Sequence, residues 1–286
     1  MQQRYYAHDP ETPLSNKLLC ILLGIVIIFL LAYVHGIVIS INPVIYLSFV
    51  ITIGFGFIFG ILYRVISKIA KVRDSKFVII SGLAIMLLGM YFSWGAYLLM
   101  LSGELEYYFP SLGLLLSPVW VFGSIGDLYT YGSWSLFGGA VVNGIFLGLI
   151  WIGELIMVLY MTFHVLRAYE IAPFSQRFNK WFIKYKLHDE YQSLADADMF
   201  FEKEGNTLTE KVKNLGRGHS TRYGRISIFY LENAGEAYFL YENVGRDSKG
   251  KKETGTAVID HLAIPNTEAA QLIKTYYGKK EFYFEY

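Results

Sequence analysis

Lysine and arginine are absent from two long stretches of this chain. None occurs between Lys76 and Arg167, and a second stretch without them runs from Leu18 to Tyr63. The short segment between these stretches carries a cluster of basic residues, namely Arg64, Lys68, Lys71, Arg73 and Lys76. Because basic side chains resist translocation, clusters beside apolar segments mark the cytosolic side of a membrane. The pattern predicts a multi-pass membrane protein and also its orientation.

Four apolar segments are long enough to cross a bilayer, which takes roughly 20 helical residues. They cover 18–39, 44–66, 77–101 and 139–166. An even number of spans puts both termini on one side, and the basic residues after the second and fourth segments place that side in the cytosol. The expected organisation is a cytosolic N-terminal segment (1–17), a four-helix transmembrane domain (18–166) and a cytosolic domain (167–286).

The loop 102–138 between the third and fourth spans has acidic and aromatic residues but no basic ones. Aromatic rings of this kind favour the headgroup layer. Ser117 and Pro118 form an N-cap and first-turn pair, which predicts a short helix from there to Leu128. Glycines and Asp127 interrupt its apolar run. We expect an extracytoplasmic cap on the membrane surface, with a re-entrant pore element as the alternative.

Two pairs of glycines lie one helical turn apart within the spans. Gly56 and Gly60 belong to the second span, and Gly144 and Gly148 belong to the fourth. Small residues at this spacing let helix backbones approach closely where no hydrophobic drive exists between helices. Both pairs predict helix packing, within one chain or between two chains.

Glu154 is the one carboxylate expected inside a span. A charge at the bilayer centre is costly, so the side chain should face the bundle interior and find a donor or take a proton. Helical periodicity places Asn143 on the same face of the fourth span. The expected partners of Glu154 are Ser93, Trp94 and His35. One interpretation is a proton-sensitive or ion-interacting site, and the other is a protonated acid that holds span four against span three.

The segment after Arg167 has the composition of a soluble domain. Aromatic residues at helical spacing predict a helix over 173–185, whose Lys180 and Lys184 would contact the anionic inner leaflet. The alternative is a helix docked on its own domain. An acidic helix is expected over 189–204, followed by a shorter helix over 207–215.

A strand-rich section follows these helices. Alternating apolar residues predict strands over 225–231, 236–244 and 256–264, with a mobile hairpin tip near 246–255. A helix from Pro265 to about residue 277 and an edge strand at 281–286 complete the expected domain. The predicted fold class is a multi-pass α-helical membrane domain followed by a small soluble α+β domain.

Composition and motifs exclude several function classes. The formal net charge of +1 is low for a nucleic-acid-binding protein. The single cysteine, Cys20, supports neither a disulfide framework nor a cysteine metal site, and we interpret it as a residue that packs within or against the membrane. No Walker loop, nucleophile elbow, zinc-protease motif or Rossmann fingerprint is present. We therefore expect no enzyme activity, metal or cofactor.

Several short motifs are shared with a known group of proteins. They are Lys71-Val-Arg-Asp74, Tyr91-Phe-Ser-Trp94, Gly132-Ser-Trp-Ser135, Val142-Asn-Gly144, Trp151-x-x-Glu154 and Val258-Ile-Asp-His-Leu262. With these motifs the chain resembles an uncharacterised family of bacterial four-span integral membrane proteins with a cytosolic C-terminal domain. Relatives carry a Cys-x-x-Cys pair after a Pro-Phe, which suits structural zinc. Here those positions are Ser175 and Phe178, so the resemblance implies that the zinc site has been lost.

These observations predict a protein of the bacterial inner membrane with both termini in the cytosol. Its expected partners are the lipid bilayer and a protein partner or a second copy of the chain. We expect a non-enzymatic scaffold or sensor whose cytosolic domain makes the contact. The alternative is a channel- or transporter-like module that uses the polar face of span four.

Overall fold

The computed structural model describes residues 4–7, 9, 11–42, 45–103, 109–132, 141–169, 172–219, 221–246, 253–276 and 278–280. The chain forms two compact units. The helical unit covers Pro10–Glu170, and the sheet unit combines Met1–Asp9 with Ile171–Tyr286. The described residues 4–7 and 9 are thus part of the same unit as the C-terminal domain, whereas the sequence predicted a separate N-terminal segment.

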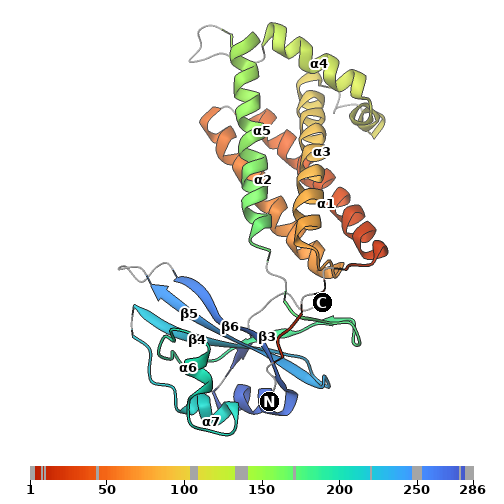
Figure 1. The fold of residues 1–286 in the computed structure, drawn as a ribbon. Helices are drawn as coiled ribbons and strands as arrows, with labels where there is room; N and C mark the ends of the chain where they lie inside the picture. Colours follow the sequence, from red (N-terminus) through yellow and green to blue (C-terminus); the bar gives the residue numbers. More distant parts are fainter. Residues whose placement is uncertain are drawn as a thin grey trace. The chain divides into compact units, whose positions relative to one another are not determined.

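Four described helices of the helical unit are long and apolar enough to cross a membrane. They are α1 (Leu14–Ile41), α2 (Ile45–Ile69), α3 (Ser75–Ser102) and α5 (Gly144–Arg167), and they are drawn in Figure 1. The four predicted spans are confirmed as apolar helices, with ends that differ from the expected ones by a few residues. Asp74 fixes the start of α3, because its carboxylate accepts a hydrogen bond from the backbone N–H of Phe77 at 3.1 Å.

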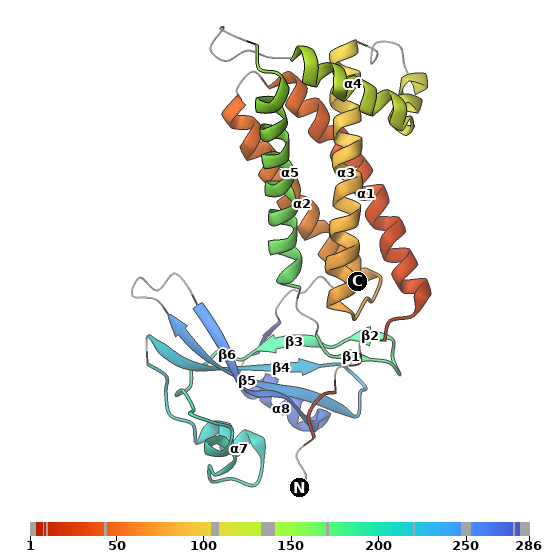
Figure 2. The same ribbon diagram turned by 45° about the horizontal axis from the view of Figure 1, so that its top comes forward.

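A short 3-10 helix, η2 (Phe109–Leu116), and the helix α4 (Pro118–Tyr131) belong to the loop between α3 and α5. Ser117 caps α4 as predicted, since its hydroxyl accepts from the backbone N–H of Trp120 at 3.4 Å. Both views show α4 lying across one end of the long helices (Figures 1 and 2). The rest of the loop, 104–108 and 133–140, is outside the described residues.

Small residues set the packing of α1 against α3. The buried positions of α1 recur every fourth residue, as Cys20, Gly24, Ile28, Ala32 and Gly36. A Cβ added to Gly36 would lie 2.5 Å from the carbonyl oxygen of Ser93. The two backbones therefore approach more closely than any larger side chain allows.

The two predicted glycine pairs behave differently. A Cβ at Gly56 would lie 2.7 Å from the carbonyl oxygen of Val158, and one at Gly60 would lie 2.8 Å from Val165, so this pair packs α2 against α5. Among the described residues, Gly144 and Gly148 make no such contact between two spans, and packing of this pair between two chains stays a prediction. Gly144 begins α5 at φ +59° with open space around it, and Gly148 faces Tyr129 of α4.

The sheet unit is built on a five-stranded antiparallel sheet with the order β6-β5-β4-β3-β7. Its strands are β3 (Ile183–Lys186), β4 (Arg222–Tyr230), β5 (Glu236–Arg246), β6 (Glu253–Pro265) and β7 (Lys279–Lys280). A separate hairpin pairs β1 (Phe174–Ser175) with β2 (Lys180–Trp181). Three helices complete the unit, namely α6 (Asp198–Phe201), α7 (Leu208–Lys213) and α8 (Asn266–Thr275).

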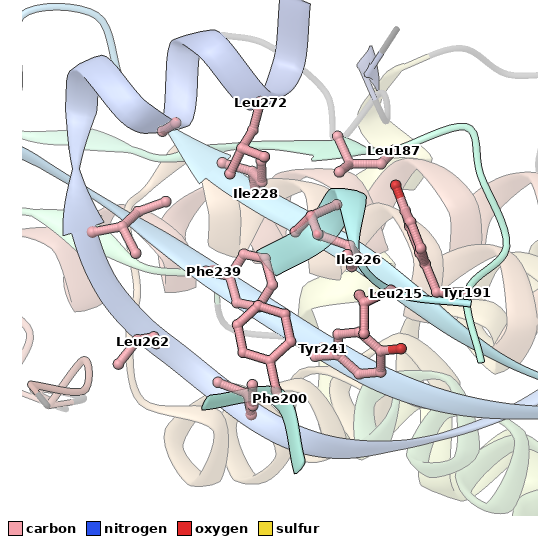
Figure 3. Close-up of a cluster of buried hydrophobic side chains, with 14 of the residues drawn as sticks. Leu187, Tyr191, Phe200, Leu215, Ile226, Ile228, Phe239, Tyr241, Leu262 and Leu272 are labelled. Atoms are coloured by element: carbon pink, nitrogen blue, oxygen red, sulfur yellow. The ribbon is translucent and has the colours of Figure 1, made fainter. Parts of the chain in front are cut away.

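One face of the sheet carries the main core, shown in Figure 3. Phe239 and Tyr241 project from β5 toward Phe200 of α6, with ring centroids 5.4 and 6.0 Å from the Phe200 ring. Leu272 of α8 and Val212 of α7 are buried in the same cluster. Alternation along β4 and β5 sends every second side chain into this core. The predicted strands 225–231, 236–244 and 256–264 are thus confirmed.

The opposite face carries a second, smaller core of Phe182, Phe229, Leu231, Tyr238 and Leu240. The N-terminal segment packs here, because the Tyr6 ring meets Tyr238 edge-on at 5.0 Å. Its backbone also pairs with β6, as the N–H of Tyr6 donates to His261 at 2.9 Å and the N–H of Ala263 donates to Arg4 at 2.7 Å. Residues 4–7 therefore cover the outer edge of β6, which would otherwise expose unpaired backbone groups.

The helix predicted over 173–185 is wrong. This segment forms the β1–β2 hairpin and then β3, which pairs with β4 from Ile183 opposite Tyr230 to Lys186 opposite Ser227. Asn179 has φ +51°, a conformation that turns the chain and that asparagine tolerates well. The aromatic residues suit strands at least as well as helices, and pairing with β4 decided between the two.

The acidic helix predicted over 189–204 is also wrong, because only α6 is helical there. Instead, the backbone around Tyr191 pairs with Gly224 of β4. The shorter predicted helix is confirmed as α7, which begins with a capping box between Thr207 and Glu210. α8 is confirmed over Asn266–Thr275. The predicted edge strand 281–286 and most of the hairpin tip 246–255 are outside the described residues.

Candidate functional site

A polar cluster joins three of the long helices. Nδ1 of His35 on α1 lies 2.6 Å from the hydroxyl of Ser93 on α3, and Nε2 of His35 lies 3.5 Å from the hydroxyl of Thr52 on α2. The imidazole also stacks on the ring of Phe55 at a centroid distance of 4.4 Å. All three polar side chains are buried. Both ring nitrogens thus have partners, so the cluster fixes α1, α2 and α3 relative to one another.

Glu154 lies on the face of α5 that is turned into the helical unit. It follows Leu147 by seven residues and precedes Val158 by four, and both of these residues are buried. Val158 of α5 lies against Gly56 of α2, and the two helices run in the same direction. One helical turn earlier on each, Glu154 of α5 is therefore at the level of Thr52 of α2. The half-buried carboxyl forms no hydrogen bond with any residue that the structure describes.

The expected partners of Glu154 are engaged elsewhere. Ser93 contacts His35, and the Trp94 ring meets Trp151 edge-on at 4.8 Å, one helical turn before Glu154. Asn143 does not share the face of Glu154, because α5 begins only at Gly144 and Asn143 is extended at its N-cap. Its side-chain amide instead donates to the carbonyl of Thr130 in α4 at 3.3 Å. A glycine with positive φ ended the helical periodicity on which the expectation rested.

The basic residues between α2 and α3 differ in their surroundings. Arg64 and Lys68 are half-buried on the last turns of α2, Lys71 lies in the turn with φ +56°, and Lys76 is exposed. Arg73 is buried and donates to the carbonyl of Glu11, while its backbone N–H donates to the hydroxyl of Thr12 at 2.9 Å. Arg73 therefore holds the segment before α1. The sequence suggested a residue at the membrane surface, but the side chain is buried.

The two basic residues predicted on a membrane-surface helix lie on strands. Lys180 is exposed on β2. Lys184 lies on β3, and its ammonium is 5.9 Å from the ring centroid of Phe229. The helical geometry that would turn both toward a bilayer does not exist in this segment, because the two lysines lie on different strands of separate sheets.

The second face of the sheet changes from apolar to charged along its strands. Toward the turn between β4 and β5 it carries Phe229 and Tyr238, and toward the other end it carries Arg225 paired with Glu242. The Arg225 guanidinium donates to the Glu242 carboxylate at 3.1 and 3.2 Å. Lys186 of β3 lies on this face as well, directly opposite Ser227 of β4.

A cleft opens at the charged end of this face and has a volume of about 220 Å³. We call it the charged cleft, and it is lined by Lys186, Leu187, His188, Asp189, Glu190, Tyr223, Arg225 and Lys279. Glu190 is paired with Arg246 at 2.6 Å, and the Arg246 guanidinium also lies 4.5 Å from the Tyr223 ring centroid. Burial, and then the nearby charge of Asp189, raises the pKa of the adjacent Tyr191 phenol, which therefore stays neutral.

The charged cleft was not anticipated from the sequence. Its residues come from β3, β4, β7 and the loop after β3, and the segment around β3 was expected to be helical. A signal was available in Ile183-Lys-Tyr-Lys186, which alternates in the way a half-buried strand does. Among the described residues, no group of three or more histidine, cysteine or acidic side chains is arranged to hold a metal ion.

The chain was compared with known proteins in three ways. No family model matches it, and neither curated proteins nor solved structures contain a significant match.

Proposed function

We propose that this chain is a non-enzymatic scaffold or sensor of the bacterial inner membrane, with both termini in the cytosol. Its sheet unit would bind a protein partner or a second copy of the chain. Three features support the proposal: the sheet unit contains residues from near both chain ends, the basic residues are unevenly distributed, and the described side chains of the helical unit pack closely.

The topology is supported by the N-terminal segment. Arg4 and Tyr6 hydrogen-bond to β6, so residues near the two ends of the chain fold into one unit. One folded unit must lie on one side of a bilayer, which requires an even number of crossings. Four apolar helices meet this requirement. The basic residues between α2 and α3 then favour the cytosolic side.

Cysteine labelling tests this topology. In a Cys20→Ser background, single cysteines are introduced as Asp127→Cys in α4, Lys76→Cys at the start of α3 and Lys213→Cys in α7. A membrane-impermeant maleimide should label only the Asp127→Cys variant in spheroplasts, and the other two only after permeabilisation. Labelling of the Lys213→Cys variant in intact spheroplasts would overturn the proposed topology.

The observation that favours a scaffold over a channel is the close packing inside the helical unit. Phe59 and Tyr63 of α2 are fully buried, and Tyr63 fills the space beside Gly24 and Gly82. The polar side chains His35, Ser93 and Thr52 are joined to one another rather than aligned along a path. An aqueous path would need a line of polar groups from one end of the helices to the other.

Two measurements test the scaffold function. A photo-crosslinking residue placed on the sheet unit of the full-length protein should give one discrete adduct in cells, of the same mass from neighbouring positions. Copies with different tags should purify together if the partner is a second copy. Absence of both an adduct and self-association would contradict the proposal.

A channel- or transporter-like module is the second candidate, and Glu154 is the observation that favours it. Its carboxyl lies at the level of the His35 cluster without a described hydrogen-bond partner. Purified protein in liposomes should then carry a proton or cation flux that Glu154→Gln abolishes. Such a flux would replace the scaffold function, whereas unchanged folding and phenotype of Glu154→Gln in cells would exclude proton coupling.

A further inference from the structure

The charged cleft contains two lysines placed directly against each other. Lys186 of β3 and Lys279 of β7 are paired residues in the antiparallel register, so their side chains leave the sheet on the same face. Like charges in directly opposed positions are destabilising. Neither ammonium forms an ion pair or hydrogen bond with a residue that the structure describes. The pair therefore raises the question of what neutralises it.

The other charged groups of the cleft only partly offset these lysines. Arg225 is paired with Glu242, and Glu190 is paired with Arg246, so these two ion pairs balance internally. Asp189 forms no salt bridge within the described part of the chain and opposes the lysines. Apart from His188, the described lining residues without an ion pair are then two lysines and one aspartate, which is two positive charges against one negative charge. A small anion would restore the balance.

Size and donor chemistry indicate the kind of anion. The volume of about 220 Å³ is below the roughly 300–1,000 Å³ of pockets that enclose drug-sized ligands. Two ammonium groups offer up to six N–H donors at close range, which suits a compact oxyanion with several acceptor oxygens. A phosphate group carries close to two negative charges and three acceptor oxygens near neutral pH. Its three acceptor oxygens match the donors of the two ammonium groups better than the two oxygens of a carboxylate.

We propose that the charged cleft binds a phosphate group between Lys186 and Lys279, carried by a soluble phosphorylated molecule or by a lipid headgroup. This site goes beyond the scaffold function and does not depend on it. Asp189 tunes the affinity, because its carboxylate repels the same anion. Arg225 keeps its ion pair with Glu242 and so holds the wall of the cleft in place.

The test uses the full-length protein in nanodiscs of neutral phosphatidylcholine. Inorganic phosphate is titrated by calorimetry, and in a second arm the protein is bound to vesicles with and without phosphatidic acid, whose headgroup is a phosphate monoester. Lys186→Gln and Lys279→Gln should each weaken the interaction about tenfold, as expected for loss of a hydrogen bond to a charged group. Lys213→Gln, an exposed lysine on α7, is the matched control and should change nothing.

Asp189→Asn should change the affinity in the opposite direction from the lysine variants. Because it removes the repelling carboxylate, it should tighten binding. Phosphate binding in neutral nanodiscs assigns the soluble source, and a response only to phosphatidic acid assigns the headgroup; both support the site. A second readout is thermal unfolding. Lys279→Gln alone should leave the unfolding temperature unchanged or raised, because a like-charge pair is relieved. The proposal is overturned if neither probe binds, or if Lys213→Gln weakens binding as much as the cleft variants.

Discussion

Where α1 meets α3, the helical unit uses small residues, whereas the sheet unit has some of its largest ones at the centre of its core. Gly24, Ala32 and Gly36 belong to the buried stripe of α1, but Phe239 and Tyr241 fill the space between β5 and the helices. In lipid there is little hydrophobic gain from bringing apolar helices together, so close backbone contact supplies the attraction. In water the burial of large apolar surface supplies it. Buried positions in the two units should therefore respond differently to substitution. A smaller side chain should destabilise the sheet unit most, and a larger side chain should destabilise the α1–α3 contact.

The largest expected effect is the loss of a core ring in the sheet unit. Phe239→Ala should destabilise this unit by about 3–5 kcal/mol, because the transfer energy is lost and a cavity remains. Chemical unfolding of the full-length protein measures it, followed through Trp181 fluorescence in a background where the other four tryptophans are replaced by phenylalanine. Met199→Ala, at a position that is 39% exposed, is the control. Equal losses from both substitutions would break the comparison.

A larger side chain should damage the helical unit. Gly36→Leu forces a side chain against the Ser93 carbonyl and Ala96, and overpacking of this kind costs about 1–3 kcal/mol or more. The fraction of monodisperse protein and its thermal midpoint in detergent report the change. Gly54→Leu serves as the control, since a Cβ at Gly54 meets nothing within 4 Å. If the control loses as much stability, close packing of α1 on α3 is not the cause.

Within the helical unit, a hydroxyl that bonds between helices can be compared with one that bonds within its own helix. Ser93→Ala removes the hydroxyl that contacts His35 Nδ1 and leaves a buried ring nitrogen without its partner, which costs about 1–3 kcal/mol. Thermal unfolding of the purified protein checks this. Ser40→Ala is the matched control, because its hydroxyl only donates to the Ile37 carbonyl of its own helix. An unchanged midpoint for Ser93→Ala would show that the cluster adds no stability.

The smallest expected effect is local to α7. Thr207→Ala removes the capping box with Glu210 and should cost about 1 kcal/mol. Hydrogen exchange of the α7 amides should rise while exchange of the β5 amides stays unchanged. Thr267→Ala, in the first turn of α8 but outside any described side-chain bond, should leave both unchanged. Faster exchange throughout the sheet would contradict a local role for α7.

The sequence by itself determined the four apolar helices and most of the strands. A helix buried in lipid must satisfy its hydrogen bonds within itself, so its length and hydropathy identify it without knowledge of its neighbours. The same local logic identified Ser117 as a cap, because a cap bonds within a few residues. β4, β5 and β6 were also predicted from the sequence, because each is an apolar, alternating segment bounded by turn residues.

Only the tertiary structure decided the segment 173–186, the placement of residues 4–7 and the charged cleft. Phe178, Trp181 and Tyr185 suit a helix or a strand, and the choice was made by pairing with β4. The N-terminal residues join β6 across more than 250 positions of sequence, a distance over which local propensity carries no information. Lys186 and Lys279 meet for the same reason, because strand register is a property of the assembled sheet.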